Sequence, residues 1–173
     1  MGGKAGMTSI VGQGSTFWFT AVLEKHEPPL AQPDTCRIDD AEAIIRQTMQ
    51  GKRILLVEDE PINREIAQAL LEDAGFAVDL AEDGAKAIEQ VKANTYDLIL
   101  MDMQMPHVNG LEATRQIRQL AVGGNVPIIA MTANAFAEDR EQCLEAGMND
   151  FIAKPVSTSL LYQKLCTWLQ KRA

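Results

Sequence analysis

Short apolar segments alternate with longer segments of helical period from residue 53 to the end of the chain. The apolar segments span residues 53–57, 77–80, 98–101, 126–131 and 150–153. Between them, apolar residues recur every three or four positions, which is the spacing of one face of an α-helix. Such alternation is typical of repeated β-α units, so the chain is predicted to fold around a parallel sheet.

The expected strands differ in how apolar they are. Residues 53–57, 98–101 and 126–131 are almost purely apolar, as expected for strands that helices cover on both faces. The strand at 77–80 is short and mixed, so it is expected at an edge of the sheet. We therefore predict an α/β fold, a flavodoxin-like (βα)5 doubly wound parallel sheet with strand order 2-1-3-4-5.

Two predicted helices carry clear apolar stripes. The first is expected to begin at Pro61, which suits an initial helical turn, and to end at Gly75. Its stripe is expected to face the core and comprises Ile62, Ile66, Ala69 and Leu70. The corresponding stripe of the last helix comprises Leu161, Leu165, Trp168 and Leu169. At this spacing both stripes are interpreted as core positions.

The first 50 residues have a different pattern. Residues 14–24 are rich in aromatic and β-branched side chains and are predicted to form a β-hairpin extension with residues 7–11. Residues 26–50 are interpreted as a linker that includes a short, weak helix from 38 to 50. The predicted division is therefore an extension at 1–25, a linker at 26–50 and a globular domain at 51–173.

The hairpin is the least self-sufficient part of this division. Phe17, Phe19, Ala21 and Leu23 share one face of its second strand, and Trp18 lies on the other. A lone hairpin is only marginally stable in water, and an apolar open edge invites pairing. We expect residues 8–24 to self-associate with another copy of the chain or to be poorly ordered.

Composition narrows the classes of partner and location. The net charge is -8 and the pI is about 4.8, which argues against a nucleic-acid-binding surface. The cysteines, Cys36, Cys143 and Cys166, are far apart and suggest neither a disulfide framework nor a thiolate metal site. No apolar run approaches the ~20 residues of a membrane span, and no signal-peptide pattern opens the chain. We expect a cytoplasmic location. An inner-membrane anchor elsewhere in a longer parent protein is compatible with this expectation.

Polar and charged residues stand where the predicted strands end. Glu58 and Asp59 follow the first strand, Asp102 the third, Thr132 the fourth and Lys154 the fifth. In an open parallel sheet, ligands bind beyond the carboxyl ends of the strands, where the strand order reverses. These five residues are therefore predicted to form one site.

The chemistry of these side chains favours phosphoryl transfer. Asp59 and Asp102 would repel each other unless a positive charge lay between them, and Mg²⁺ is a suitable ion because it binds carboxylates, waters and phosphate oxygens. A carboxylate beside such an ion can act as a nucleophile and form an aspartyl-phosphate. Lys154 and the hydroxyl of Thr132 are expected to bind the phosphoryl oxygens.

Four sequence blocks resemble those of response-regulator receiver domains: VEDEPINR (57–64), LILMDMQMPHVNG (98–110), PIIAMTANA (127–135) and DFIAKPV (150–156). The resemblance extends from residue 53 to 172. It implies that Asp102 is the phosphoacceptor. It also implies a Mg²⁺ site made by Asp59, Asp102 and the backbone carbonyl of Gln104, with Glu58 acting through a water molecule.

The same resemblance assigns switch residues. Thr132, Ala133, Phe151 and Pro155 occupy the corresponding positions, and the bond between Lys154 and Pro155 is expected to be cis. This sequence departs from the family pattern at two positions. Glu58 stands where many members have Asp, a change that should preserve metal binding. Phe151 stands where some members have Tyr, so its ring brings no hydroxyl to the switch.

A second resemblance covers the N-terminal residues. GGKAG and GQGSTFWFTAVLE are similar to the closing segment of the ATP-binding domain of histidine kinases. The nucleotide-binding residues and the phosphorylatable histidine region of those kinases are not in this sequence. No kinase activity is therefore expected beyond self-phosphorylation and self-dephosphorylation at Asp102. The two resemblances together imply a position in the C-terminal part of a hybrid sensor kinase.

The expected function is that of a phosphorelay receiver in a two-component system. The implied partner is either the dimerisation domain of a histidine kinase, which carries the phosphohistidine, or a histidine phosphotransfer protein. A receiver that acts as a docking module without phosphorylation is an alternative, and it would show no dependence on Mg²⁺. An aspartate-nucleophile phosphatase is a further alternative. Such enzymes resemble D-x-D-x-[TV], whereas Met103 and Gln104 follow Asp102.

Overall fold

The computed structural model describes residues 3–10, 14–20, 38–133 and 137–171. The chain divides into two compact units, Met1–Pro33 and Asp34–Ala173, which are described separately. No helix within the described ranges is both long enough and apolar enough to span a membrane.

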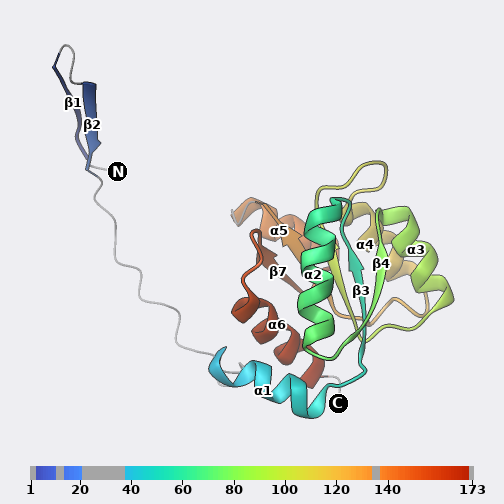
Figure 1. Cartoon of the computed structure of the whole chain (residues 1–173). Helices are drawn as coiled ribbons and strands as arrows, with labels where there is room; N and C mark the ends of the chain where they lie inside the picture. The colour runs from blue at the N-terminus through green and yellow to red at the C-terminus, as the bar shows by residue number, and fades with distance from the viewer. Residues whose placement is uncertain (1–2, 11–13, 21–37, 134–136, 172–173) are drawn as a thin grey trace. The chain divides into compact units, whose positions relative to one another are not determined.

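A five-stranded parallel sheet forms the centre of the second unit (Figure 1). Its strands are, in chain order, β3 (Arg53–Val57), β4 (Ala77–Ala81), β5 (Leu98–Asp102), β6 (Ile128–Thr132) and β7 (Asp150–Ala153). The spatial order β4-β3-β5-β6-β7 confirms the predicted 2-1-3-4-5 topology, with the mixed strand at an edge. One strand begins two residues later than predicted, because Pro127 has no backbone N–H to contribute to the ladder.

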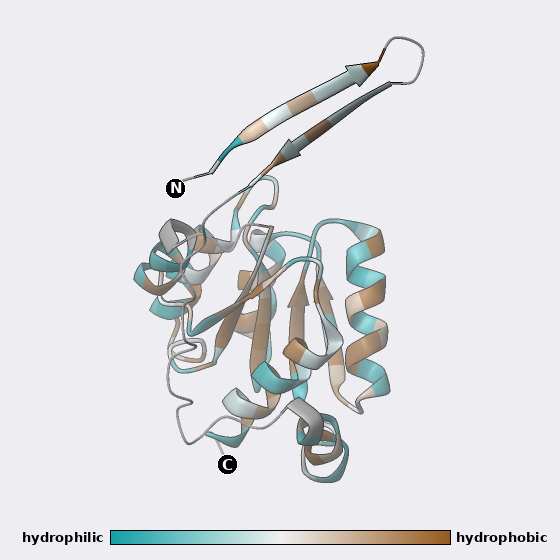
Figure 2. Cartoon of the chain, turned by 90° about the vertical axis from the view of Figure 1, so that its left-hand side faces the viewer, coloured by the Kyte–Doolittle hydropathy of each residue, from teal (hydrophilic) through white to brown (hydrophobic). Residues whose placement is uncertain are grey.

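Six helices are described in this unit: α1 (Ile38–Thr48), α2 (Pro61–Asp73), α3 (Gly84–Ala93), α4 (Gly110–Gln119), α5 (Ala137–Glu145) and α6 (Thr158–Gln170). One core cluster joins α1, α2 and α6 to the sheet, and a second joins α3 and α4 to its other face (Figure 1). The strands between these layers are strongly apolar (Figure 2). The doubly wound arrangement is thus confirmed.

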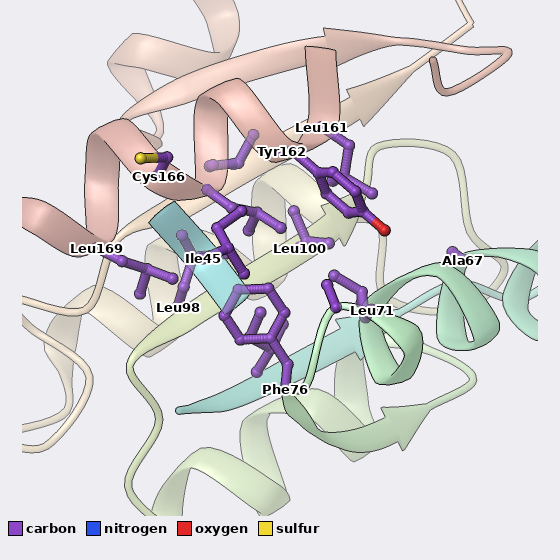
Figure 3. Packing of buried hydrophobic residues seen from close by; sticks show 14 of the residues in the cluster. Ile45, Ala67, Leu71, Phe76, Leu98, Leu100, Leu161, Tyr162, Cys166 and Leu169 are labelled. Carbon is purple, nitrogen blue, oxygen red and sulfur yellow. The ribbon is translucent and has the colours of Figure 1, made fainter. Parts of the chain in front are cut away.

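Helix α1 lies in the stretch that the sequence suggested was mainly a linker. Its Ala41 and Ile45 are fully buried, and Ile45 packs near Phe76, Leu98 and Leu100 (Figure 3). The Arg46 guanidinium also donates hydrogen bonds to the backbone carbonyl and the carboxylate of Asp73, at 2.7 and 2.6 Å. The weak helix expected from 38 to 50 is therefore present, and it contributes to the core.

The apolar stripe predicted for α2 was wrong in part. Ile62 and Ile66 are 66% and 57% exposed and Ala69 is exposed as well, whereas the buried positions of the helix are Ala67 and Leu71. The core-facing side is therefore rotated from the expected one. Periodicity marks an apolar stripe, but it does not say which neighbour covers that stripe.

The first unit contains the predicted hairpin. Strand β1 (Ala5–Ile10) pairs antiparallel with β2 (Gly14–Phe19). Its large apolar side chains are exposed, among them Met7, Phe17 and Phe19. Residues 11–13 and 21–24, which the prediction also included, lie outside the described residues.

A half-buried arginine links the loops that precede β6 and β7. The guanidinium of Arg118 donates to the carbonyls of Gly123, Val126 and Gly147 and to the side-chain oxygen of Asn149, at 2.7–2.9 Å. Burial lowers the pKa of Arg118. Because a buried carbonyl without a partner costs about 1–3 kcal/mol, this side chain should contribute strongly to stability.

We predict that Arg118→Met lowers the free energy of unfolding by about 3 kcal/mol, since several buried carbonyls lose their donor together. Urea denaturation at equilibrium measures this change. Arg115→Met is the matched control: Arg115 is exposed and makes only a 3.8 Å ion pair with Glu112. It should change stability by less than about 0.5 kcal/mol. Equal effects of the two substitutions would contradict the prediction.

Candidate functional site

The strand ends bring the five predicted side chains to one edge of the sheet. Parallel pairing aligns the end of β3 with that of β5, then β5 with β6 and β6 with β7. Asp102 and Thr132 are the last residues of their strands, and Glu58, Asp59 and Lys154 immediately follow theirs. The register of the sheet thus assembles residues that are up to 96 positions apart in sequence.

Lys154 connects two of the acids. Its Nζ lies 2.7 Å from Oε2 and 2.9 Å from Oε1 of Glu58, and 2.8 Å from Oδ2 of Asp102. Both acids are almost completely enclosed, at 2% and 4% exposure. The bond from Lys154 to Pro155 is cis, as predicted. One ammonium group is therefore shared by two buried carboxylates and compensates part of their charge.

The pKa shifts of the two partners follow from this arrangement. Burial raises the pKa of Glu58, and the nearby charge of Asp102 adds to the rise, although Lys154 opposes it. For Lys154, burial alone would lower the pKa, but the hydrogen bonds with Asp102 and Glu58 outweigh it and raise the pKa. The ammonium therefore stays charged because the acids surround it.

The third acid completes a cluster that fits a divalent cation. Glu58, Asp59 and Asp102 each offer one carboxylate oxygen, and these oxygens all lie within 4.8 Å of one another. Oxygen ligands of this kind, with room for water on the exposed side, suit Mg²⁺. The N–H of Gln104 donates to Oδ1 of Asp102 at 3.2 Å, which places this residue beside the cluster.

The residues expected to act as switches lie around this cluster. Thr132 is buried at the end of β6, and Ala133 and Pro155 are exposed beside it. Phe151 is half-buried in β7, and the cationic groups of Arg140 and Lys164 lie 5.6 and 5.7 Å from the centroid of its ring. These contacts of the ring need no hydroxyl.

Two site residues were not predicted from the sequence. Asn63 donates from its side chain to Oε1 of Glu58 at 3.2 Å, and Arg64 donates to the backbone carbonyls of Glu58 and Asp59. Both lie on the first turn of α2, directly after the acids. Their position five and six residues after Glu58 was the only available signal.

A pocket of about 410 Å³ adjoins the cluster. Glu58 and Lys154 form its polar end, and the rest of its lining is mainly apolar and includes Ile66, Leu70 and Val156. The exposed side of α2 and the segment after β7 therefore flank the approach to the acids.

Residues 54–166 match the family described as the response regulator receiver domain. The chain belongs to this family. Among curated proteins, this receiver domain is similar to the aerobic respiration control sensor protein ArcB of Escherichia coli, with 36% identity over 162 residues. That match covers 93% of this chain and 20% of ArcB. The chain spans only 6% to 20% of the first curated relatives it matches.

Solved structures support the same family. The receiver domain of sensor histidine kinase PA1611 from Pseudomonas aeruginosa, with a magnesium ion coordinated in its active-site cleft, is 47% identical. The match has a TM-score of 0.66 and covers 69% of this chain and 98% of that one. The receiver domain of Ssk1 from Saccharomyces cerevisiae, crystallised with the histidine phosphotransfer protein Ypd1, is 31% identical. This match has a TM-score of 0.67 and covers 72% of this chain and 92% of that one.

We predict that Lys154→Met makes stability strongly dependent on pH. Removal of the ammonium leaves Glu58 beside a second buried acid without its counter-charge, which raises the pKa of Glu58 further in the folded state. When the pKa of an acid is higher in the folded than in the unfolded state, the protein loses stability as the pH rises from the unfolded pKa through the folded pKa. The deficit relative to wild type should therefore be small near pH ~5 and reach about 3 kcal/mol near pH ~7.5.

Urea denaturation across this pH range measures the deficit. Lys86→Met is the control, because Lys86 pairs with Glu82 on the exposed side of α3 and should give a small deficit at every pH. A deficit for Lys154→Met that does not change with pH would argue against two coupled buried acids.

Proposed function

We propose that this receiver domain accepts a phosphoryl group from a phosphohistidine onto Asp102 in a Mg²⁺-dependent reaction. It would then switch or relay the signal within a two-component hybrid histidine kinase. The observation that carries the proposal is the buried Asp102 carboxylate, bonded to Lys154 and clustered with Glu58 and Asp59, in a chain of the receiver family. The magnesium-bound relative supports the choice of ion.

Each residue has a distinct role in the proposed reaction. Asp59, Asp102 and the backbone carbonyl of Gln104 would hold Mg²⁺, with Glu58 acting through water. The ion would supply positive charge to the phosphoryl oxygens. A carboxylate oxygen of Asp102 forms a bond to phosphorus as the bond from phosphorus to the histidine nitrogen breaks.

Lys154 and Thr132 would then bind the transferred group. The Nζ of Lys154 already lies 2.8 Å from Oδ2 of Asp102, so a small shift brings it to a phosphoryl oxygen. The hydroxyl of Thr132 and the backbone N–H of Ala133 would bind another oxygen. Movement of Thr132 would favour a second position of Phe151, with Pro155 on the adjoining loop, and so change the face that a partner contacts.

Incubation of the domain with Mg²⁺ and acetyl phosphate should add the mass of one phosphoryl group, as intact-protein mass spectrometry measures. Asp102→Asn should abolish the gain, because the amide is not a nucleophile of comparable strength. Asp73→Asn is the control, since Asp73 is exposed at the far end of α2. An unchanged mass in the wild type would refute the proposal. Phosphorylation that continues at the same rate after Mg²⁺ has been chelated would refute the proposed role of the metal ion.

The proposed partner is a phosphohistidine protein, either the dimerisation domain of a histidine kinase or a histidine phosphotransfer protein. Asp102 is 4% exposed, so the donor must approach closely along the open side of the site. Ile62 and Ile66 are exposed on α2, and Ile66 also lines the pocket next to Glu58 and Lys154. We propose this apolar side of α2 as the donor's contact surface. The complex of the Ssk1 receiver with Ypd1 supports a histidine phosphotransfer protein as the kind of donor.

The double substitution Ile62→Ser and Ile66→Ser should slow transfer from a phosphorylated histidine phosphotransfer protein by more than about tenfold in kcat/KM. It should leave the rate with acetyl phosphate unchanged, because that donor needs no protein interface. Val122→Ser, at an exposed position after α4, is the control. An equal slowing with both donors would place the defect in the chemistry and contradict the proposed contact surface.

The proposed context is a hybrid sensor kinase, in which residues 1–25 end the ATP-binding domain, 26–50 link it and 51–173 form the receiver, with α1 of the linking stretch packed on the receiver core. The similar proteins of Dictyostelium discoideum named hybrid signal transduction histidine kinases B and I support this context. The exposed Met7, Phe17 and Phe19 of the hairpin fit a strand pair separated from a larger sheet. In isolation these side chains would favour self-association of the chain. The domain itself would lie in the cytoplasm, whether or not the parent is anchored in the inner membrane.

A further inference from the structure

The first turn of α2 holds the segment that carries two of the acids. Arg64 extends back over the end of β3, and its Nη1 donates to the backbone carbonyl of Glu58 at 2.8 Å and to that of Asp59 at 3.2 Å. The preceding residue, Asn63, donates to the Glu58 carboxylate at 3.2 Å. One helical turn therefore contacts both the backbone and a side chain of this segment.

The turn is itself firmly positioned. Glu60 caps the helix, because its Oε2 accepts hydrogen bonds from the N–H groups of Ile62 and Asn63, at 2.9 and 3.1 Å. Pro61 occupies the first helical position, where its missing N–H costs nothing. Arg64 thus extends from a fixed base, so its guanidinium can hold the connection between β3 and α2 in one conformation.

Asp59 depends on this connection more than the other acids do. Lys154 holds the carboxylates of Glu58 and Asp102 directly, at 2.7–2.9 Å. Among the residues that the structure describes, the Asp59 carboxylate has no hydrogen bond or ion pair. Its distance from the other two acids is therefore set by its backbone, and Arg64 binds the carbonyl of that backbone.

We propose that Arg64 is a positioning residue, which fixes the backbone of Glu58 and Asp59 so that the acids bind Mg²⁺ together. The inference rests on the proposed Mg²⁺ site. Arg64 donates to carbonyls and leaves the carboxylate oxygens open to the ion, whereas Lys154 occupies carboxylate oxygens. Residues that orient metal ligands in this way typically contribute about 10- to 100-fold to metal affinity.

Charge and position predict opposite effects when Arg64 is replaced. Arg64 is a cation close to a site for a dication, so removal of its charge alone should strengthen Mg²⁺ binding. Loss of its two hydrogen bonds should instead free the connection and weaken binding. Arg64→Met removes the charge and the bonds but keeps an apolar stem of similar shape. Its Mg²⁺ affinity therefore reveals which effect is larger.

The test is a Mg²⁺ titration of the unphosphorylated domain, followed by the amide NMR shifts of the site. We expect Arg64→Met to raise the Kd for Mg²⁺ about tenfold. Arg64→Lys, which keeps a charged donor, should recover part of the loss. The phosphorylation rate of Arg64→Met with acetyl phosphate should approach that of the wild type once Mg²⁺ is saturating, because the residue acts on the binding of the ion.

Arg46→Met is the matched control. It removes the same charge and also breaks bonds to a backbone carbonyl and a carboxylate, but at the opposite end of α2. Thermal unfolding in EDTA verifies that each variant folds, and Arg64→Gln replaces Arg64→Met if the latter does not. A wild type that fails to bind Mg²⁺ refutes the proposed site. If the wild type binds Mg²⁺ and the Arg64 variants bind it as tightly as Arg46→Met or more tightly, the positioning role alone is refuted.

Discussion

The structure must accommodate three carboxylates whose oxygens lie within 4.8 Å of one another at one edge of a sheet. Two of them are almost fully enclosed, so their mutual repulsion is poorly screened by water. Lys154 compensates this charge through bonds to Glu58 and Asp102. The cluster is stable only because the cation arrives at the end of a strand that the sheet places next to the acids. The site and the fold therefore depend on each other.

The sheet achieves this placement through its register and its two covering layers. Each strand pairs so that its carboxyl end falls at the same edge, and the core clusters on both faces fix that register. A slip of one residue would exchange the two faces of a strand and disrupt the packing of both core clusters. Burial far from the site thus determines which side chains meet within it.

The sequence was sufficient for the strands and the acids, and insufficient for helix faces and for bonds to backbone. The runs at 53–57 and 98–101 are so apolar that only a central strand suits them, and a polar residue at each end then marks the site. The exposed stripe of Ile62 and Ile66 has the same period as a buried one, so periodicity assigned it wrongly. The role of α1 was also hidden, since its core contacts come from segments distant in sequence. Arg64 binds carbonyl groups, which every residue has, so no pattern of side chains predicts its partners.

The two cations at the site divide the work in a way that suits a reversible switch. Lys154 binds carboxylate oxygens of Glu58 and Asp102, the acids of the proposed reaction, so it would give up some of these contacts when a metal ion or a phosphoryl group bound. Arg64 binds carbonyl oxygens that neither species uses, so its contacts can persist throughout. A site held only by contacts to carboxylates, such as those of Lys154, would lose its geometry whenever a metal ion or a phosphoryl group bound. A site held only by contacts to carbonyls, such as those of Arg64, would leave the buried acids without a counter-charge in the empty state, at a cost of several kcal/mol. Contacts of both kinds, from Lys154 and from Arg64, would give the acids a partial counter-charge and a fixed backbone throughout the proposed cycle.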